Sequence, residues 1–412
     1  MTLDAKMAWR NIWRNPRRSL LTMFAIAFAT VLLVFMLSWQ FGSYETMINT
    51  AVKIHTGHLQ VQAKGYREKR DIRLVVPDPA AVGKVLETIP EVAAYASRAN
   101  AFSLVSSKDR TYGVMVIGID PERESRVSSL KSIIHEGTYL SSTDTNQALL
   151  GRLLAKNLRV DLGDEVVLLG QGRDGSIAAT MVQVKGIFKS GQDEFDRNFI
   201  NIPLPFFQDV YAMDGAVHEV VALGESLEDV PEIKRVVKAG IEKLSNQRDL
   251  VVLDWKELMP GLIQAIQMDL VSGFIFYIIL IVVVAFSILN TFLMAIFERT
   301  REFGVLMAMG TTPRRLTRLL LLESCSMTLL GVIFGSIIGS LITWYFQDHG
   351  IVIHGAAELT HHYGLPERMY PHLSMLSICT GAGVVLIITL LTALYPALKI
   401  RRLRPVKAMA AI

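Results

Sequence analysis

The chain of 412 residues is 51% apolar and 19% charged, and its mean hydropathy is +0.36. This balance excludes an ordinary soluble domain, and it equally excludes a chain made only of membrane spans. It predicts a few spans beside a sizeable soluble part, within a formal net charge of only +4.

The first predicted element is an amphipathic helix that precedes the first apolar run. Trp9 and Trp13 lie four residues apart, as do Arg10 and Arg14, so each pair shares one face of a helix. Tryptophan at the headgroup level and arginine toward water are typical of a helix on a membrane surface. Pro16 is expected to break this helix before the first span.

Four apolar runs are long enough to cross a hydrocarbon core of about 30 Å at about 1.5 Å per residue. They are Ser19–Phe41, Leu270–Phe297, Ser324–Phe346 and Leu373–Leu398. The first run is longer than the apolar core of a signal peptide, and no small-residue cleavage site follows it. We therefore interpret it as a retained anchor.

The distribution of charge predicts the orientation of these runs. Fifteen of the 42 basic residues lie before the first run, just after the second or after the fourth, among only four acidic residues. These regions share one side if all four runs span, and the positive-inside rule makes that side cytoplasmic. Residues 42–269 have a net charge of −5 and lie outside. This asymmetry indicates membrane topology and gives no sign of a nucleic-acid partner.

The predicted fold class is an α/β membrane protein, with four transmembrane helices and a large extracytoplasmic mixed α/β domain between the first two. The predicted parts are a cytoplasmic amphipathic helix (1–18), transmembrane helix 1 (19–41), an extracytoplasmic domain with a stalk (42–269), transmembrane helix 2 (270–297), a cytoplasmic coupling segment (298–318), transmembrane helix 3 (319–346), an extracytoplasmic loop (347–372), transmembrane helix 4 (373–398) and a cytoplasmic tail (399–412).

Within the outer domain, strand-like segments alternate with helical ones. The strands are expected at Thr56–Lys64, Glu165–Gly170 and Thr180–Phe188, and the helices at Ala80–Ile89 and Val230–Gln247. Two such helix-and-strand units predict a pair of α/β lobes. Both cysteines fall inside apolar runs, so no disulfide holds this domain together.

Two clusters suggest a metal site weakly. Asp193, Glu194 and Asp196 lie together after a strand, and the loop at residues 347–372 holds five of the nine histidines. Acidic loops are usually solvated, and the histidines lack the spacing of a metal motif, so we predict no metal. No GxSxG or HExxH motif occurs either, and the chain is predicted not to be an enzyme.

The third apolar run carries a row of small residues, Gly331, Gly335 and Gly339. Such a row lets another helix backbone approach closely, either within this chain or in a second copy. No ionisable residue lies at the middle of a span, which is evidence against an ion-coupled transporter.

The segment "ERTREFGVLMAMGTTPRRL" (Glu298–Leu316) predicts a helix–glycine–helix elbow. Phe303–Met309 forms the first helix, which Gly310 closes in a left-handed conformation. Thr312 is the expected N-cap of the next helix, and Pro313 its first residue. The apolar side chains of this elbow either enter the lipid interface or dock in a groove of a soluble partner.

The whole chain resembles the FtsX-like/MacB-like permeases, the four-span subunits of mechanotransmission ABC transporters. The resemblance lies in "WRNIWRNPRRSLLTMFAIAFAT", in the elbow segment itself and in the ending "YPALKIRRLRPVKAMAAI". Between them, "LLGRLLAKNLRVDLGDEVVL" and "VKGIF" are similar to outer-domain motifs of the family. "IHTGHLQVQAKGY" and "LDWKELMPGL" look closer to the lipoprotein-releasing LolC/LolE branch.

This resemblance implies that the elbow is the coupling helix, which docks on a dimer of cytoplasmic ATPase subunits. The implied coupling residues are Arg301, Glu302, Gly304, Met307, Gly310 and Pro313. The chain has no GxxxxGK[ST] phosphate loop, so ATP and Mg²⁺ would be bound by the ATPase, and this chain would bind no cofactor. A second permease copy or a paralogue completes the assembly in the bacterial inner membrane.

The implied function is to extract or release a lipoprotein or another amphiphile at the outer leaflet, with a periplasmic lipoprotein or chaperone as a further partner. The candidate acyl-chain residues are Phe24, Phe28, Phe35, Phe274 and Ile278. An alternative is a non-transporting scaffold that relays the state of the ATPase to a cell-wall hydrolase; the large outer domain favours substrate handling. The sequence leaves the substrate, the direction of transport and the identity of the second subunit open.

Overall fold

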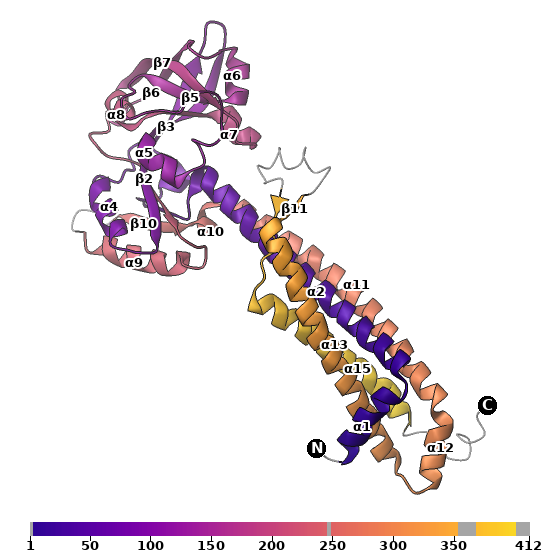
Figure 1. Cartoon of the computed structure of the whole chain (residues 1–412). Coiled ribbons are helices and arrows are strands. Elements are labelled where there is room, and N and C mark those ends of the chain that lie inside the picture. The colour runs from indigo at the N-terminus through magenta and orange to yellow at the C-terminus, as the bar shows by residue number, and fades with distance from the viewer. Residues whose placement is uncertain (1–2, 245–248, 353–367, 401–412) are drawn as a thin grey trace. The chain divides into compact units, whose positions relative to one another are not determined.

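The computed structural model describes residues 3–244, 249–352 and 368–400 (Figure 1). The chain divides into two compact units. The membrane unit comprises residues 3–44, 266–352 and 368–400, and the α/β unit comprises residues 45–244 and 249–265.

Four helices in the described part of the chain are long and apolar enough to span a membrane, as the sequence predicts. The helices of this part are α1 (Leu3–Arg14), α2 (Pro16–Ala51), α11 (Pro260–Glu298), α12 (Thr300–Ala308), α13 (Pro313–His349) and α15 (Met375–Ile400). A short pair of strands, β11 (Ile351–Val352) and β12 (Arg368–Met369), joins the last two.

The first two spanning helices are longer than the apolar runs that predict them. Helix α2 begins at Pro16 and continues to Ala51, ten residues past the end of its run, and α11 begins ten residues before Leu270. Polar residues with good helix propensity continue a helix whether or not lipid surrounds it. Hydropathy therefore locates a span but not the ends of its helix.

Helices α2 and α13 pack closely through the row of small residues. A Cβ atom on Gly331 would lie 2.9 Å from the Ile26 side chain, and one on Gly335 would lie 2.5 Å from the carbonyl oxygen of Ala27. One on Gly339 would lie 3.2 Å from the Cα atom of Val31. The predicted close approach is therefore made within this chain.

The α/β unit is built on one sheet, in the strand order β10-β1-β9-β2-β3-β8-β5-β7-β4, with β6 pairing with both β2 and β7. Its strands are β1 (Leu59–Ala63), β2 (Val92–Ser106), β3 (Thr111–Ile119), β4 (Ile134–Gly137), β5 (Gln147–Gly151), β6 (Glu165–Gln171), β7 (Ile177–Phe188), β8 (Phe199–Pro203), β9 (Glu219–Gly224) and β10 (Leu250–Asp254). Its helices are η1 (Val52–Thr56), α3 (Tyr66–Lys69), α4 (Pro79–Glu87), α5 (Pro121–Val127), α6 (Arg152–Leu158), α7 (Asp193–Asn198), α8 (Leu204–Val210), α9 (Val230–Glu242) and α10 (Trp255–Leu258).

The pair of lobes predicted from the sequence shares this continuous sheet. Strand β2 is 15 residues long, so its first half pairs with β9 while its second half pairs with β6. Helices α4 and α9 lie beside β9 and β10, whereas α6 and α8 lie with the strands of the other half (Figure 1). The lobes are therefore two helix-covered ends of one sheet.

An ion pair is buried under this sheet. The Arg98 guanidinium donates from Nε to Oε2 of Glu124 at 2.9 Å and from Nη2 to Oε1 at 2.7 Å, and it also donates to the backbone carbonyl of His55. Both side chains are at most 3% exposed. Such a bidentate pair satisfies the buried charges, and neither group can be removed alone without leaving the other uncompensated.

His218 makes the stability of the α/β unit depend on pH. Burial lowers the pKa of His218 to about 4, although a hydrogen bond to the carbonyl of Ile72 opposes the shift. The ring stays neutral in the fold, where Nδ1 accepts the Asn100 amide proton at 2.9 Å. An unfolded histidine titrates near pH 6.5, so between about pH 6.5 and pH 4 the unfolded state binds the extra proton.

We expect thermal stability to be complete above pH 6.5 and to decline as the pH falls toward 4, with a slope approaching about 1.4 kcal/mol per pH unit from this residue. Burial also lowers the pKa of His55 and His58 and adds to the decline. The melting temperature of the full chain between pH 7.5 and 4.5 measures it. His218→Gln should flatten the profile, whereas replacement of the exposed His135 should leave it unchanged.

Candidate functional site

The elbow between α11 and α13 is the first candidate site. Helix α12 ends where Gly310 adopts a φ of +95°, and the Thr311 amide donates to the Leu306 carbonyl at 3.0 Å. Pro313 then begins α13. Thr312 occupies the N-cap position, but its side chain makes no capping hydrogen bond, in contrast to the prediction. Backbone conformation alone therefore makes this elbow.

Helix α12 has a buried face and an exposed face. Phe303, Gly304 and Met307 are buried, and the two large side chains pack with residues of α11 and α13. Val305 and Met309 are exposed, Met309 by 70%. These two lie four residues apart and form one apolar stripe on the outer face.

The predicted coupling residues divide between these faces. Arg301, Glu302 and Gly310 are exposed, and Pro313 is half-buried. Gly304 and Met307 are buried inside this chain, so neither side is open to a partner. Val305 and Met309 take their place on the open face, and their spacing in the sequence is the signal that identifies them.

A chain of charged groups ties the elbow to two other helices. Arg14 of α1 forms an ion pair with Glu302 of α12. Arg299 contacts Glu302 at 3.4 Å and Glu323 of α13 at 3.1 Å, and its contact with Glu323 is buried. Although burial opposes it, the hydrogen bond and charge of Arg14, with the charge of Arg299, lower the pKa of Glu302. Sequence reasoning missed the pairing of Arg14, Arg299 and Glu323.

A cavity of about 460 Å³ lies in the membrane unit between α2 and α11. One wall is polar: Tyr44 donates to Asp269 at 2.6 Å, Gln40 donates to Tyr44 at 2.8 Å, and Tyr277 donates to Gln40 at 2.8 Å. The remaining wall is mainly apolar and includes Phe35, Met36, Trp39, Phe276 and Ile351. This cavity can hold a molecule with one polar and one apolar end.

Only one of the five predicted acyl-chain residues lines this cavity. Phe35 does, and its ring packs on Phe346 with centroids 6.0 Å apart. Phe24 and Phe28 stack on each other at 6.4 Å on the exposed surface of α2. Phe274 and Ile278 are exposed on α11.

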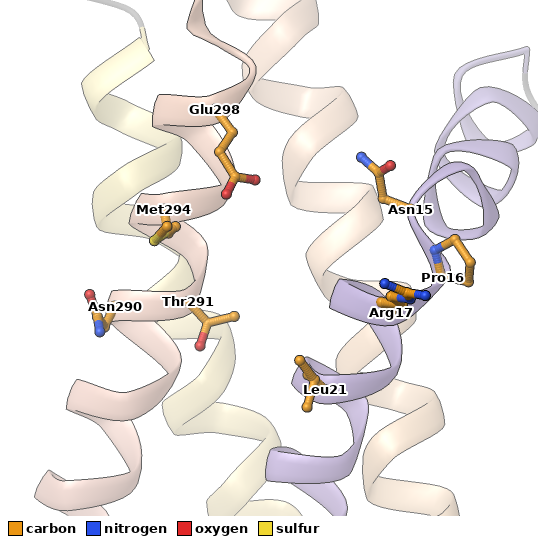
Figure 2. A pocket seen from close by; sticks show the side chains of 8 residues that line it. All are labelled: Asn15, Pro16, Arg17, Leu21, Asn290, Thr291, Met294 and Glu298. Atoms are coloured by element: carbon orange, nitrogen blue, oxygen red, sulfur yellow. The ribbon is translucent and has the colours of Figure 1, made fainter.

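A second cavity, of about 650 Å³, lies at the opposite ends of the same two helices (Figure 2). Glu298 and Thr291 project from α11 into the gap, and Arg17 and Leu21 line it from α2. The residues that line it are Asn15, Pro16, Arg17, Leu21, Asn290, Thr291, Met294 and Glu298. No sequence motif pointed to this cavity.

The two predicted weak metal clusters have these surroundings. Asp196 accepts hydrogen bonds from the Ser190 amide and hydroxyl at 2.8 and 2.6 Å, and burial raises its pKa. In the loop at 347–372, His349 stacks on Tyr345, while His354, His361 and His362 lie outside the described residues. Among the described residues, no three His, Cys, Asp or Glu side chains are grouped to hold a metal.

Comparisons with known proteins agree with this architecture. The model for the FtsX-like permease C-terminal region matches residues 274–405, and the model for the MacB-like periplasmic core domain matches residues 19–239. The second match covers more than half of the chain.

Three relatives represent the named proteins to which the chain is similar. The lipoprotein-releasing system transmembrane protein LolC of Xylella fastidiosa is 25% identical over 336 residues, which cover 78% of each chain. LolE of Haemophilus influenzae is 21% identical over 79% of each chain. The macrolide export ATP-binding/permease protein MacB of Campylobacter jejuni is 21% identical over 83% of this chain and 53% of its own length.

The four spanning helices, the α/β unit between the first two and both matched models lead to one conclusion. The chain belongs to the FtsX-like permeases of ABC transporters, and it carries a MacB-like periplasmic core domain between its first two spanning helices.

Proposed function

We propose that this chain is the membrane subunit of an ABC transporter and that a separate ATPase subunit, with bound ATP and Mg²⁺, docks on the exposed face of α12. The observation that carries the proposal is the apolar stripe of Val305 and Met309 beside the exposed Arg301. The opposite face of α12 is anchored by Phe303 and Met307 in the core of its own chain. A helix held on one side and open on the other suits docking in a groove.

The charged chain around Glu302 supports a relay from this docking helix. A push on α12 acts on α1 through the pair of Glu302 with Arg14 and on α13 through Arg299 and Glu323. The buried pair is held more firmly than the exposed one, since solvent screens exposed pairs strongly. We propose that α13 receives the larger part of the motion.

The substrate proposed is a lipoprotein or another amphiphile, handled in the outer leaflet of a bacterial inner membrane. The 460 Å³ cavity combines the polar group of Tyr44 and Asp269 with apolar walls, as an amphiphile requires. The names of LolC and LolE are consistent with such a substrate. The proposed orientation follows the positive-inside rule, with both termini and α12 in the cytoplasm, and a second permease copy or paralogue completes the assembly.

Replacing Val305 or Met309 with Asp should abolish co-purification of the ATPase. An unpaired charge would enter the apolar contact, while the fold is retained because both side chains are exposed. Co-purification of the tagged full chain from its native membrane, followed by quantification of the ATPase, measures the effect. Retention is expected to fall at least about tenfold, equivalent to about 1.4 kcal/mol.

Val236→Asp is the matched control, because Val236 is a partly exposed valine on α9 of the α/β unit. It should leave ATPase binding unchanged. Wild-type ATPase binding in both α12 variants would contradict the docking face. If the ATPase binds and no amphiphile is bound or moved, the chain is instead a scaffold that relays the state of the ATPase.

A further inference from the structure

We propose that the 650 Å³ cavity between the start of α2 and the end of α11 binds the headgroup of one ethanolamine phospholipid. All eight lining residues belong to the membrane unit. The volume lies within the range of about 300–1,000 Å³ that is typical of pockets for organic ligands. A single inorganic ion would leave most of it empty.

The charges at the rim select a ligand that carries both signs. Arg17 and Glu298 stand on opposite walls of the gap (Figure 2). A guanidinium donates two parallel hydrogen bonds to a phosphate, and a carboxylate accepts hydrogen bonds from an ammonium group. Glu298 repels a ligand that is only anionic, and Arg17 repels one that is only cationic. A phosphate linked to a primary ammonium group satisfies both walls.

The lining changes with depth in the order that a phospholipid requires. Asn290 lies eight residues before Glu298 on α11, about 12 Å deeper at about 1.5 Å per residue. Its amide and the hydroxyl of Thr291 lie at a depth where ester groups follow the phosphate. The exposed side chains of Leu21 and Met294 supply apolar surface for the first carbons of the acyl chains.

The adjoining helix places the cavity at the membrane surface. Helix α1 ends at Arg14, directly before Asn15 and Pro16 of the cavity wall. Its Trp9 and Trp13 are exposed and contact each other edge to face at 6.3 Å. Exposed tryptophans on a short amphipathic helix are typical of the headgroup level. A cavity at this level opens to lipid headgroups.

The assignment to the inner leaflet rests on the orientation proposed above, whereas the chemistry of the ligand does not. The site is at the other end of α2 and α11 from the 460 Å³ cavity, so its occupant is separate from the proposed substrate. A lipid bound here would hold the ends of α2 and α11 apart beside the elbow.

Native mass spectrometry of the full-length chain tests the proposal. The chain is released from micelles that contain equal amounts of phosphatidylethanolamine, phosphatidylglycerol and phosphatidylcholine with identical acyl chains. We expect one ethanolamine lipid to be retained per chain. Choline, whose quaternary ammonium cannot donate a hydrogen bond to Glu298, should be retained less.

Two variants separate the two charges. Glu298→Gln should reduce the preference for ethanolamine over glycerol lipid about fivefold, and Arg17→Gln should reduce retention of all three lipids by a similar factor, since each loses a charge-assisted hydrogen bond. Arg10→Gln is the matched control, because Arg10 is an exposed arginine on α1 outside the cavity. It should retain the wild-type pattern.

The proposal fails if no lipid is retained, or if the Arg17 and Glu298 variants keep the wild-type preference. A second measurement avoids extraction from the membrane. Phosphatidylethanolamine with a photoreactive headgroup, placed in vesicles with the full chain, should label the peptides that contain Arg17 or Glu298. Cross-linking of Leu21→Cys chains to each other in the same vesicles would show that a second copy covers the cavity, and would also overturn the proposal. ATPase co-purification is scored separately, so its loss leaves this result standing.

Discussion

Replacing Arg98 with Met should lower the free energy of unfolding of the α/β unit by roughly 3–5 kcal/mol, because it leaves Glu124 buried without its partner. Both hydrogen bonds from the guanidinium are lost, and so is the one to the carbonyl of His55. For a unit of this size, the melting temperature should fall by about 10 °C. Thermal unfolding of the full chain in detergent measures the change.

The double variant, with Arg98→Met and Glu124→Leu, should recover much of this loss, since no buried charge remains unpaired. Arg235→Met is the surface control, because Arg235 pairs with Glu232 where both side chains are more than half exposed. It should change stability by no more than about 1 kcal/mol. Equal melting temperatures for the Arg98 and Arg235 variants would contradict the structural importance of the buried pair.

Replacing Gly335 with Ala should destabilise the membrane unit by about 1–3 kcal/mol, because the new methyl group overpacks the contact of α13 with α2. The added Cβ would lie 2.5 Å from the Ala27 carbonyl oxygen, and backbone cannot move aside as a flexible side chain can. Helices α2 and α13 must therefore separate. The thermal stability of the full chain in detergent checks this prediction.

Gly383→Ala provides the comparison, because a Cβ there meets nothing within 4 Å. Both changes gain the higher helix propensity of alanine, so the difference between them isolates packing. Gly383→Ala should be neutral or mildly stabilising. Gly339→Ala should fall between the two, since its nearest contact would be 3.2 Å. A Gly335 variant as stable as the Gly383 variant would contradict the close approach of α2 and α13.

Features set by neighbouring residues could be predicted from the sequence. The four spans follow from local hydropathy, and the elbow follows from Gly310 and Pro313, whose effects on the backbone are local. The α/β character of the unit between the first two spans also follows from local periodicity. In contrast, the joining of its lobes in one sheet depends on the pairing of β2 with strands far away in the chain.

The contacts of the candidate sites depend on distant residues and were mostly missed. Arg14 and Glu302 are 288 positions apart, and neither stands out among the basic and acidic residues around it. An apolar residue in a span looks the same whether it faces lipid, a helix or a cavity. Of the predicted aromatic residues, Phe35 therefore lines the 460 Å³ cavity, while Phe24 and Phe274 do not.

The glycine row of α13 also bears on how two membrane subunits would meet. Because Gly331, Gly335 and Gly339 are already covered by α2, this tightest surface is a permanent joint within one chain. The spanning part of α11 is only 6% buried and presents large side chains such as Phe286. We expect neighbouring subunits to meet there through bulky, loosely fitted side chains. Such a seam can open and close in each cycle, while the glycine joint moves as a single piece.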